Sequence, residues 1–264
     1  MKIGFIGCGN MAKAMISGIL KNGLAKKEDI YASDISEAGR MAAKEQLGIQ
    51  MSDSNLEVVA NTDVFVLSVK PQYYETVIAE IKDSVKKEQL IVTIAPGKTL
   101  AWLLEQFGKE VKIVRCMPNT PALVSAGMTA ATPNVFVTKE ELAQVVKILD
   151  SFGKTEVVGE HLMDAVVSVS GSSPAYVYMM IEAMADGAVA DGMPRDMAYK
   201  FAAQAVMGSA KMVLESGKHP GELKDMVCSP AGTTIEAVRT LEKEGFRSSI
   251  LEAMKVCTAK AKGM

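Results

Sequence analysis

The sequence is poor in the residues from which metal centres and disulfide frameworks are built. It has four cysteines and two histidines among 264 residues, and no two cysteines form a CxxC pair. Zinc sites and redox pairs contain such closely spaced ligands, so the sequence predicts neither a metal site nor a disulfide framework. We interpret the cysteines as free thiols of a reducing compartment.

An excess of positive charge and long apolar runs are also missing. Lys and Arg number 29 against 31 Asp and Glu, and aromatic residues make up 5%. Nucleic-acid-binding proteins concentrate basic residues or aromatic stacking platforms, so no nucleic-acid partner is expected. No apolar run reaches the roughly 20 residues of a membrane span. Gly4, Gly7 and Gly9 interrupt the only N-terminal segment resembling a signal peptide. These features predict a cytoplasmic protein without a membrane partner.

Short apolar runs alternate with helix-like segments in the first half of the chain. The runs typical of buried strands are 2–6, 30–32, 64–69, 90–94 and 111–116. Segments of helical periodicity separate them, at 11–22, up to Leu47, at 73–85 and at 100–107. Strands that are apolar on both faces and alternate with helices indicate a doubly wound, parallel, Rossmann-type α/β sheet. We expect this domain to span residues 1–160.

The second half contains helical periodicity alone. Long segments rich in Ala, Met and Leu cover 175–190, 197–214, 234–241 and 248–260. The sequence therefore predicts an all-helical domain over residues 161–264. These helices are apolar nearly all round, which is more than about 100 residues can bury. A second copy of the chain is expected to cover one face, giving a homodimer.

The segment 7–12, GCGNMA, fits the dinucleotide-binding pattern G-x-G-x-x-[GA]. It follows the first predicted strand and opens the first predicted helix. Gly7 allows the tight turn, Gly9 lets a pyrophosphate approach the backbone, and Ala12 allows close packing of helix on strand. The helix N-terminus offers N–H groups to the phosphates. We predict a nicotinamide dinucleotide, NADPH or NADH, at this loop.

Asp34 ends the second predicted strand, where an acidic residue grips the ribose 2′-OH and repels a 2′-phosphate. Ser33, Ser36 and Arg40 lie nearby and could instead hold that phosphate. A second interpretation of Asp34 is a helix N-terminal cap without a ligand. The choice between NADPH and NADH therefore stays open.

Five segments together resemble one enzyme family. They are GFIGCGNMA at 4–12, SVKP at 68–71, MPNTP at 117–121, SGSSPAY at 170–176 and KDMVCSPAGTT at 224–234. In this order they are similar to Δ1-pyrroline-5-carboxylate reductases, and the likeness covers nearly the whole chain. The last segment is the most specific, because a dinucleotide fold alone does not require it.

The resemblance implies NAD(P)H-dependent reduction of the ring C=N of Δ1-pyrroline-5-carboxylate to L-proline, the last step of proline synthesis. It implies helical domains that interlock two subunits, with a larger assembly of dimers left open. The cofactor residues, from the motif and the resemblance together, are Ile6, Gly7, Cys8, Gly9, Asn10, Met11, Asp34, Asn55, Val69, Lys70, Pro71, Ala95 and Asn119. The substrate carboxylate would lie against Ser229, Ala231, Gly232, Thr233 and Thr234. Asp34 departs from the family, whose members often have a small or hydroxylated residue there.

Simpler interpretations exist for most of these residues. Lys70 follows an apolar strand, so it can meet a phosphate or ribose or be a solvated loop lysine. Asn119 and Thr120 stand between two prolines, either beside the ligands or in a structural turn. The 229–234 segment precedes a helix expected near Ile235, and can hold a carboxylate or supply a cap through Thr233. The 170–174 segment also precedes a predicted helix, and its hydroxyls can lie near the ring nitrogen of the substrate or cap that helix.

Hydride transfer to C=N is easiest when the nitrogen is protonated, and water can supply that proton. The protein then mainly orients the reactants, and Ser172 and Thr120 are weak candidates for a general acid. A β-hydroxyacid dehydrogenase is the rival enzyme, with Lys200 or Lys211 as its catalytic lysine. A dinucleotide-sensing protein is the non-enzymatic alternative, and it would not need the 229–234 segment.

Overall fold

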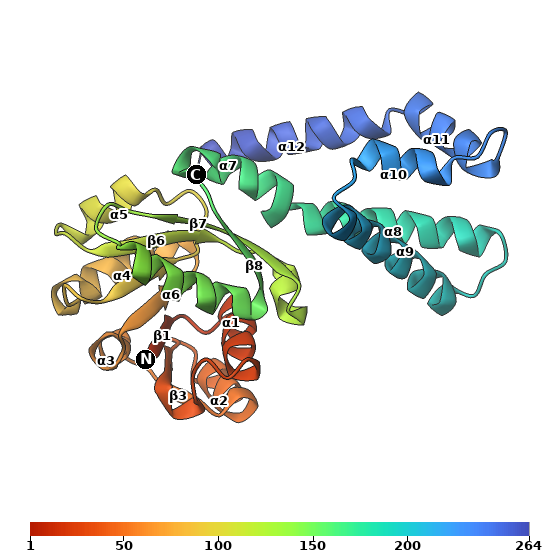
Figure 1. Ribbon diagram of the computed structural model, residues 1–264. Helices are drawn as coiled ribbons and strands as arrows, with labels where there is room; N and C mark the ends of the chain where they lie inside the picture. The colour runs from red at the N-terminus through yellow and green to blue at the C-terminus, as the bar shows by residue number, and fades with distance from the viewer. Residues whose placement is uncertain (264) are drawn as a thin grey trace. The chain divides into compact units, whose positions relative to one another are not determined.

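The computed structural model describes residues 1–263, which form two compact units. The sheet unit contains Met1–Ser172 together with the C-terminal residues from Cys257, and the helical unit contains Ser173–Val256 (Figure 1). The chain thus returns to the sheet unit at its end. A functional boundary at residue 160 stays a prediction.

The sheet unit is built on one eight-stranded sheet of order β3-β2-β1-β4-β5-β6-β7-β8. The strands are β1 Ile3–Ile6, β2 Ile30–Ser33, β3 Gln50–Ser52, β4 Val64–Leu67, β5 Leu90–Thr93, β6 Lys112–Met117, β7 Gly127–Pro133 and β8 Gly153–Val157. The chain order reverses beside β1, which pairs in parallel with both β2 and β4. Ligands of doubly wound folds bind at this switch point, beyond the carboxyl ends of the strands.

The sheet is mostly parallel, and its far edge was not expected from the sequence. β7 pairs antiparallel with β6, and β8 pairs in parallel with β7. β3, β7 and β8 lack the continuous apolar runs of the central strands. Residues of β8 are exposed or half-buried along its whole length. The edge strands β3 and β8 have no period that distinguishes them from loops, whereas β7 lies inside the sheet and is built mostly of small residues.

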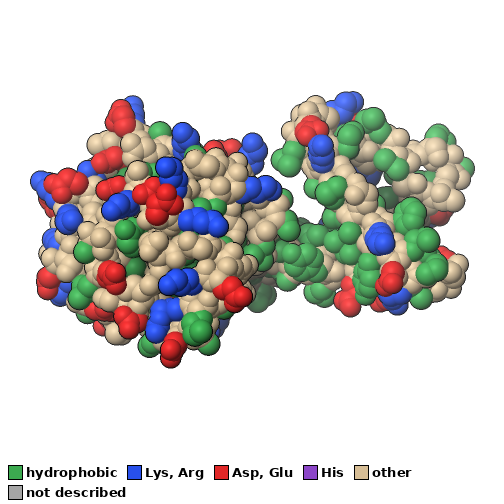
Figure 2. Space-filling view, turned by 90° about the horizontal axis from the view of Figure 1, so that it is seen from below, with side chains coloured by type: hydrophobic (Ala, Val, Ile, Leu, Met, Phe, Trp, Pro, Cys, Tyr) green, Lys and Arg blue, Asp and Glu red, His purple; other side chains and the backbone are tan. Residues whose placement is uncertain are grey.

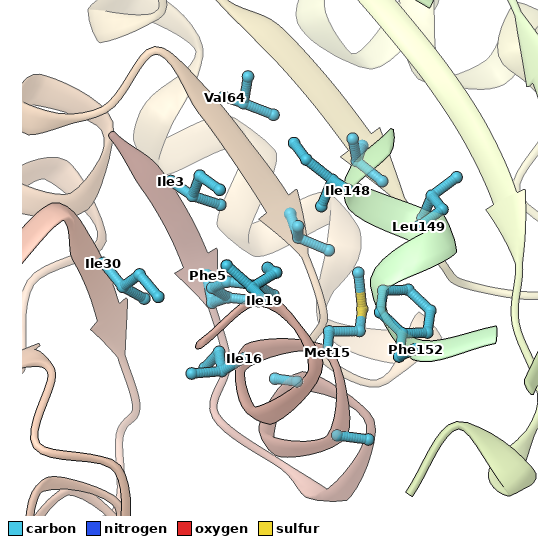
Figure 3. Close-up of a cluster of buried hydrophobic side chains, with 14 of the residues drawn as sticks. Ile3, Phe5, Met15, Ile16, Ile19, Ile30, Val64, Ile148, Leu149 and Phe152 are labelled. Atoms are coloured by element: carbon cyan, nitrogen blue, oxygen red, sulfur yellow. The ribbon is translucent and has the colours of Figure 1, made fainter. Parts of the chain in front are cut away.

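Helices cover both faces of the sheet. The α1 (Asn10–Lys21), α2 (Glu37–Leu47) and α6 (Lys139–Leu149) helices pack on one face, and α3 (Asn55–Asn61), α4 (Tyr74–Ile81) and α5 (Leu100–Phe107) pack on the other. Met15 and Ile19 of α1 pack with Ile148 of α6 and Phe152 over β1, the strand that carries Ile3 and Phe5 (Figure 3). Ser36, Ser54, Thr99 and Thr138 cap α2, α3, α5 and α6.

Five helices make up most of the remainder. They are α8 Ser173–Ala190, α9 Arg195–Ser216, α10 Pro220–Val227, α11 Thr233–Lys243 and α12 Phe246–Lys262. A short α7 (Met163–Val166) and a π-helical turn (Val167–Gly171) precede them. The α10 helix lies outside the segments predicted as helical, and the proline near its start, Pro220, is typical of a break in a helix. It stands at the first helical position, where a missing N–H has no cost.

The helical unit has almost no interior of its own. Its buried hydrophobic residues are Ala185, Ala198 and Ala202, whereas Met179 and Phe201 are more than half exposed. Hydrophobic side chains gather over the surface of this unit in Figure 2. None of the helices in residues 1–263 is long and apolar enough to cross a membrane.

Candidate active site

The glycine loop connects β1 to α1 and has the conformation that the motif predicts. Gly7 has φ +91°, and a Cβ there would lie 2.9 Å from the Val69 side chain. A Cβ on Gly9 would meet no atom within 4 Å. Gly9 is the N-cap of α1, and no side chain caps that helix. The loop therefore leaves open space over Gly9 beside helical N–H groups, as a pyrophosphate requires.

Three strand ends hold this loop. Ser68, after β4, donates its hydroxyl to the carbonyl oxygen of Gly7 (2.7 Å) and that of Ile6 (3.1 Å). The Gly7 N–H donates to the Ser33 carbonyl of β2 over 2.9 Å. The Cys8 N–H donates to Oδ2 of Asp34 over 2.9 Å. The loop is fixed by contacts between residues 26 to 61 positions apart.

A cavity of about 480 Å³ adjoins the loop. Its lining consists of Gly7, Gly9, Asp34, Ile35, Asn55, Ser68, Val69, Lys70, Tyr73, Thr76, Val77 and Glu80. Six residues of the predicted cofactor set are among them: Gly7, Gly9, Asp34, Asn55, Val69 and Lys70. The structure thus brings together residues from the ends of three strands. Lys70 is exposed at the start of the turn before α4.

The wall contributed by α4 was missed by the sequence interpretation. Tyr73, Thr76, Val77 and Glu80 come from one helix and the turn before it. The sequence predicted this segment only as a helix between two strands. The available signal was their position, since the first turns of a helix after a ligand-binding strand end face the same cleft.

Other predicted cofactor residues lie outside this lining. Ile6 at the end of β1 and Cys8 within the loop are buried, and Ala95 is buried just after β5. Asn10 and Met11 form the first turn of α1, and Pro71 follows Lys70.

The structure contradicts the interpretation of Asp34 as the N-terminal cap of the following helix. Ser36, not Asp34, caps α2, because its hydroxyl accepts the Gly39 N–H at 3.1 Å. The Asp34 carboxylate instead accepts the N–H groups of Cys8 and Ser36, each at 2.9 Å. Arg40 donates through Nη1 to the Asp34 carbonyl (2.8 Å).

Asn55 is held from both sides at the cavity wall. Its Oδ1 accepts the Ser33 hydroxyl at 2.7 Å, and its Nδ2 donates to Glu80 over 2.7 Å. Ser33 therefore faces Asn55 and Ser36 caps a helix. Of the three side chains considered for a 2′-phosphate, Arg40 is the one that carries a positive charge.

Tyr74 joins the ends of two strands beneath the site. Its buried hydroxyl donates to the Leu67 carbonyl over 2.5 Å and accepts the Ile94 N–H at 3.3 Å. Burial raises the pKa of this phenol above its usual range. Because β4 and β5 carry the Val69–Pro71 turn and Ala95, Tyr74 helps to fix their separation.

The buried cysteines are unsuited to nucleophilic chemistry. Burial raises the pKa of the Cys8 thiol to about 11, so it stays protonated at neutral pH. Burial also raises the pKa of Cys116. Within residues 1–263, no three His, Cys, Asp or Glu side chains gather as a metal-binding group.

Two further motifs meet in the sheet unit. Asn119 donates through Nδ2 to the carbonyl and the hydroxyl of Ser170, both at 3.2 Å, and its Oδ1 accepts the Met128 N–H. Thr120 is exposed directly after it. The Ser172 hydroxyl accepts the Cys257 thiol at 3.2 Å. The 117–121 and 170–172 segments are thus adjacent, and the Asn119 amide stabilises that junction.

The 229–234 loop of the helical unit ends at an uncapped helix. Ala231 has φ +56°, and the Gly232 N–H donates to the Ser229 carbonyl over 3.1 Å. Gly232 is the N-cap of α11, which begins at Thr233 rather than near Ile235, and no side chain caps it. The alternative role of Thr233 as a cap is therefore wrong. The first-turn N–H groups of α11 lie beside two threonine hydroxyls, an arrangement suited to an anion.

Two family models match separate parts of the chain. Residues 160–264 match a family model described as pyrroline-5-carboxylate reductase dimerisation. Residues 2–97 match one described as NADP oxidoreductase, coenzyme F420-dependent.

Relatives match along the whole chain. A pyrroline-5-carboxylate reductase of Escherichia coli (strain K12) is 55% identical over 260 residues, 98% of this chain and 97% of that protein. The reductase structure from Coxiella burnetii is 33% identical and covers 99% of this chain and 97% of its own, with TM-score 0.91. The one from Plasmodium falciparum, with NADP bound, is 32% identical and covers 100% and 97%, with TM-score 0.91. The chain belongs to the pyrroline-5-carboxylate reductase family.

Proposed function

We propose that this chain reduces Δ1-pyrroline-5-carboxylate to L-proline with NADPH or NADH, as the last step of proline synthesis. One observation carries the proposal: the chain combines an open glycine loop with an uncapped Ser-Pro-Ala-Gly-Thr-Thr loop before α11. A dinucleotide-sensing protein would need the first loop but not the second. Membership of the family supports the same reaction.

The glycine-loop site fits a dinucleotide. The space over Gly9 and the uncapped N-terminus of α1 suit a pyrophosphate. Asp34, Asn55 and Lys70 line the adjoining cavity, where the adenosine and its ribose would lie. Val69, Pro71, Ala95 and Asn119 complete the proposed contacts toward the nicotinamide. The bound reduced nicotinamide supplies a hydride.

The 229–234 loop is proposed to hold the substrate carboxylate. No arginine stands in this loop, so the anion must be met by neutral donors. The N–H groups of Thr233 and Thr234, the positive end of the α11 dipole and two hydroxyls provide them. Ser229 shapes the loop, because a Cβ on Gly232 would lie 2.3 Å from its hydroxyl oxygen.

The imine nitrogen receives its proton from water in this proposal, and the protein orients the reactants. Ser172 and Thr120 stay weak candidates for an acid. Thr120 is exposed to solvent. The Ser172 hydroxyl has an oxygen that already accepts the Cys257 thiol, and its own proton can point elsewhere.

We further propose that the helical units of two chains interlock as a homodimer. A groove of about 440 Å³ between α8 and α9 is lined by Met180, Met184, Val206 and Val213 among others. Apolar surface of this kind needs a cover of similar chemistry. The match of residues 160–264 to a dimerisation domain supports this, and a larger assembly of dimers stays open.

The test is oxidation of NADPH and of NADH by purified protein with pyrroline-5-carboxylate, beside a β-hydroxyacid with NADP and NAD. We expect turnover with pyrroline-5-carboxylate and none with the β-hydroxyacid. Turnover of the hydroxyacid instead, abolished by Lys200→Ala or Lys211→Ala, would establish the rival dehydrogenase. Lys211 pairs with Glu215 at 3.6 Å on the exposed face of α9, which does not favour that role. Cofactor binding without any turnover would leave a dinucleotide sensor.

A further inference from the structure

We infer that Asp34 is a positioning residue of the glycine loop, which supports NADH and NADPH equally instead of selecting NADH through the ribose 2′-OH. The inference rests on the dinucleotide site proposed above and deepens it. It replaces the expectation drawn from the position of Asp34 at the end of β2.

The contacts of the carboxylate carry the inference. Oδ2 accepts the N–H of Cys8, the central residue of the Gly7-Cys8-Gly9 turn, and Oδ1 accepts the N–H of Ser36. Both oxygens are therefore bonded to backbone without a ligand. A hydrogen bond from an N–H to a charged acceptor is among the stronger kinds in proteins. Asp34 thus ties the glycine loop to the start of α2.

The contact with Cys8 also decides which donors face a phosphate. The Cys8 N–H points to Asp34, so it is not available to a ligand. The N–H groups of the first turn of α1, from Asn10 and Met11, lie beyond Gly9 at a helix end that no side chain caps. Asp34 orients the loop so that these helical donors define the pyrophosphate position.

The electrostatic surroundings of Asp34 weaken its ability to repel a 2′-phosphate. Arg40 donates through Nη1 to the carbonyl oxygens of Asp34 (2.8 Å) and Ile35 (3.2 Å). A positive guanidinium therefore lies on the same turn as the negative carboxylate. The guanidinium contacts the backbone of this turn and forms no ion pair with the carboxylate, and the two opposite charges partly offset one another in their effect on a third charge outside the turn. A 2′-phosphate at this turn therefore meets a positive charge as well as a negative one.

The test compares Asp34→Ala and Asp34→Asn with Glu37→Gln, a control that removes an exposed negative charge from the first turn of α2. Affinities for NADH, NADPH, ADP and adenosine are measured by fluorescence titration and calorimetry. We expect Asp34→Ala to weaken NADH, NADPH and ADP by a common factor of about ten to a hundred. Adenosine has no pyrophosphate, so its affinity should not change.

Asp34→Asn can keep one of the two acceptor bonds, so it should restore part of the loss for both cofactors. Because Asp34→Asn keeps the shape of the side chain, it can be tested in place of Asp34→Ala if the alanine variant folds poorly. Glu37→Gln should bind all four ligands as the wild type does. If the Asp34 variants bind NADH more weakly and NADPH more tightly, the inference is overturned, and Asp34 selects the cofactor through the ribose 2′-OH. Unchanged affinities in both Asp34 variants would overturn it too. A wild-type protein that binds neither dinucleotide would instead refute the proposed cofactor site.

Discussion

The two units of this chain differ in how much of their apolar surface they bury within a single chain. The sheet unit buries large side chains such as Phe5, Phe65 and Phe152 completely within a single chain. The helical unit buries three alanines and exposes several methionines, Phe201 and Leu214 along α8 and α9. Similar apolar content therefore gives a self-sufficient core where a sheet separates two helix layers, and an open surface where helices pack in pairs. The sheet unit should be stable alone, whereas the helical unit should depend on a second copy.

The two proposed ligand loops differ in the same way. Contacts from β2 and β4 fix the glycine loop, over sequence separations of 26 and 61 residues. The 229–234 loop is closed locally by the bond from Gly232 to Ser229. Cofactor binding should thus be preorganised by the sheet, and substrate binding should be more sensitive to changes in the helical unit.

The largest effect is expected from a substitution that should prevent two helical units from associating. Met184→Lys places a charge in the α8–α9 groove, and an unpaired buried charge costs roughly 3–5 kcal/mol. The dissociation constant of the dimer should rise more than a hundredfold. Light scattering should show monomers, and reductase activity should be lost. Met41→Lys, at an exposed methionine of α2 in the sheet unit, is the control and should stay dimeric. A dimeric Met184→Lys protein would place the interface elsewhere.

Next in size is Gly9→Val, which tests the preorganised loop of the sheet unit. The added side chain meets no protein atom but occupies the space proposed for the pyrophosphate. Losing two hydrogen bonds to a charged group, at about 1.5–3 kcal/mol each, corresponds to a hundredfold or more in Kd. NADH and NADPH titrations should show equal losses, with the melting temperature nearly kept. Gly7→Ala should instead lower the melting temperature, because that position has φ +91° and contacts Val69. Full cofactor affinity in Gly9→Val would move the pyrophosphate off this loop.

A smaller effect is expected for Thr234→Ala in the helical unit. Loss of one hydrogen bond to the substrate carboxylate should lower kcat/KM about ten- to a hundredfold. Much of this should appear in KM if the contact is equal in ground and transition states. NADPH affinity should be unchanged. Thr240→Ala, on the same helix with its hydroxyl bonded to the Glu236 carbonyl, is the matched control. Lost NADPH affinity in Thr234→Ala would assign this loop to the cofactor.

The smallest effect is expected for Tyr74→Phe. Removing the hydroxyl leaves the Leu67 carbonyl and the Ile94 N–H without this partner, at a cost of about 1–3 kcal/mol in stability. Thermal unfolding should report it, while the dimer stays intact. Tyr31→Phe, half-buried on β2, should change stability by less. Equal stabilities of the two variants would show that the Tyr74 hydroxyl does not hold β4 and β5 together.

Sequence patterns predicted the central strands, the glycine loop and the helical second half, because each has a strong local signal. A buried strand such as Val64–Leu67 is apolar at every position, and Gly7 and Gly9 stand at fixed offsets from a strand and a helix. The 229–234 segment was found through its family resemblance, since its small residues alone also fit a helix cap. β3 and β8 were not predicted because short, half-exposed edge strands carry no periodic signal. β7 lies between β6 and β8, and it was not predicted because its Gly, Thr and Ala residues form no continuous run of large apolar side chains.

The sequence by itself determined which segments fold locally, since propensity, periodicity and turn chemistry act over a few neighbouring residues, and it predicted which of them bind ligands. Only the tertiary structure decided which of those segments contact one another. The bond from Cys8 to Asp34, the wall that α4 adds to the cavity and the junction of Asn119 with Ser170 all join residues distant in the chain. Such contacts depend on the register and order of strands in the sheet. No pattern within a single segment encodes them, because the two partners of each bond are brought together only when the whole sheet forms.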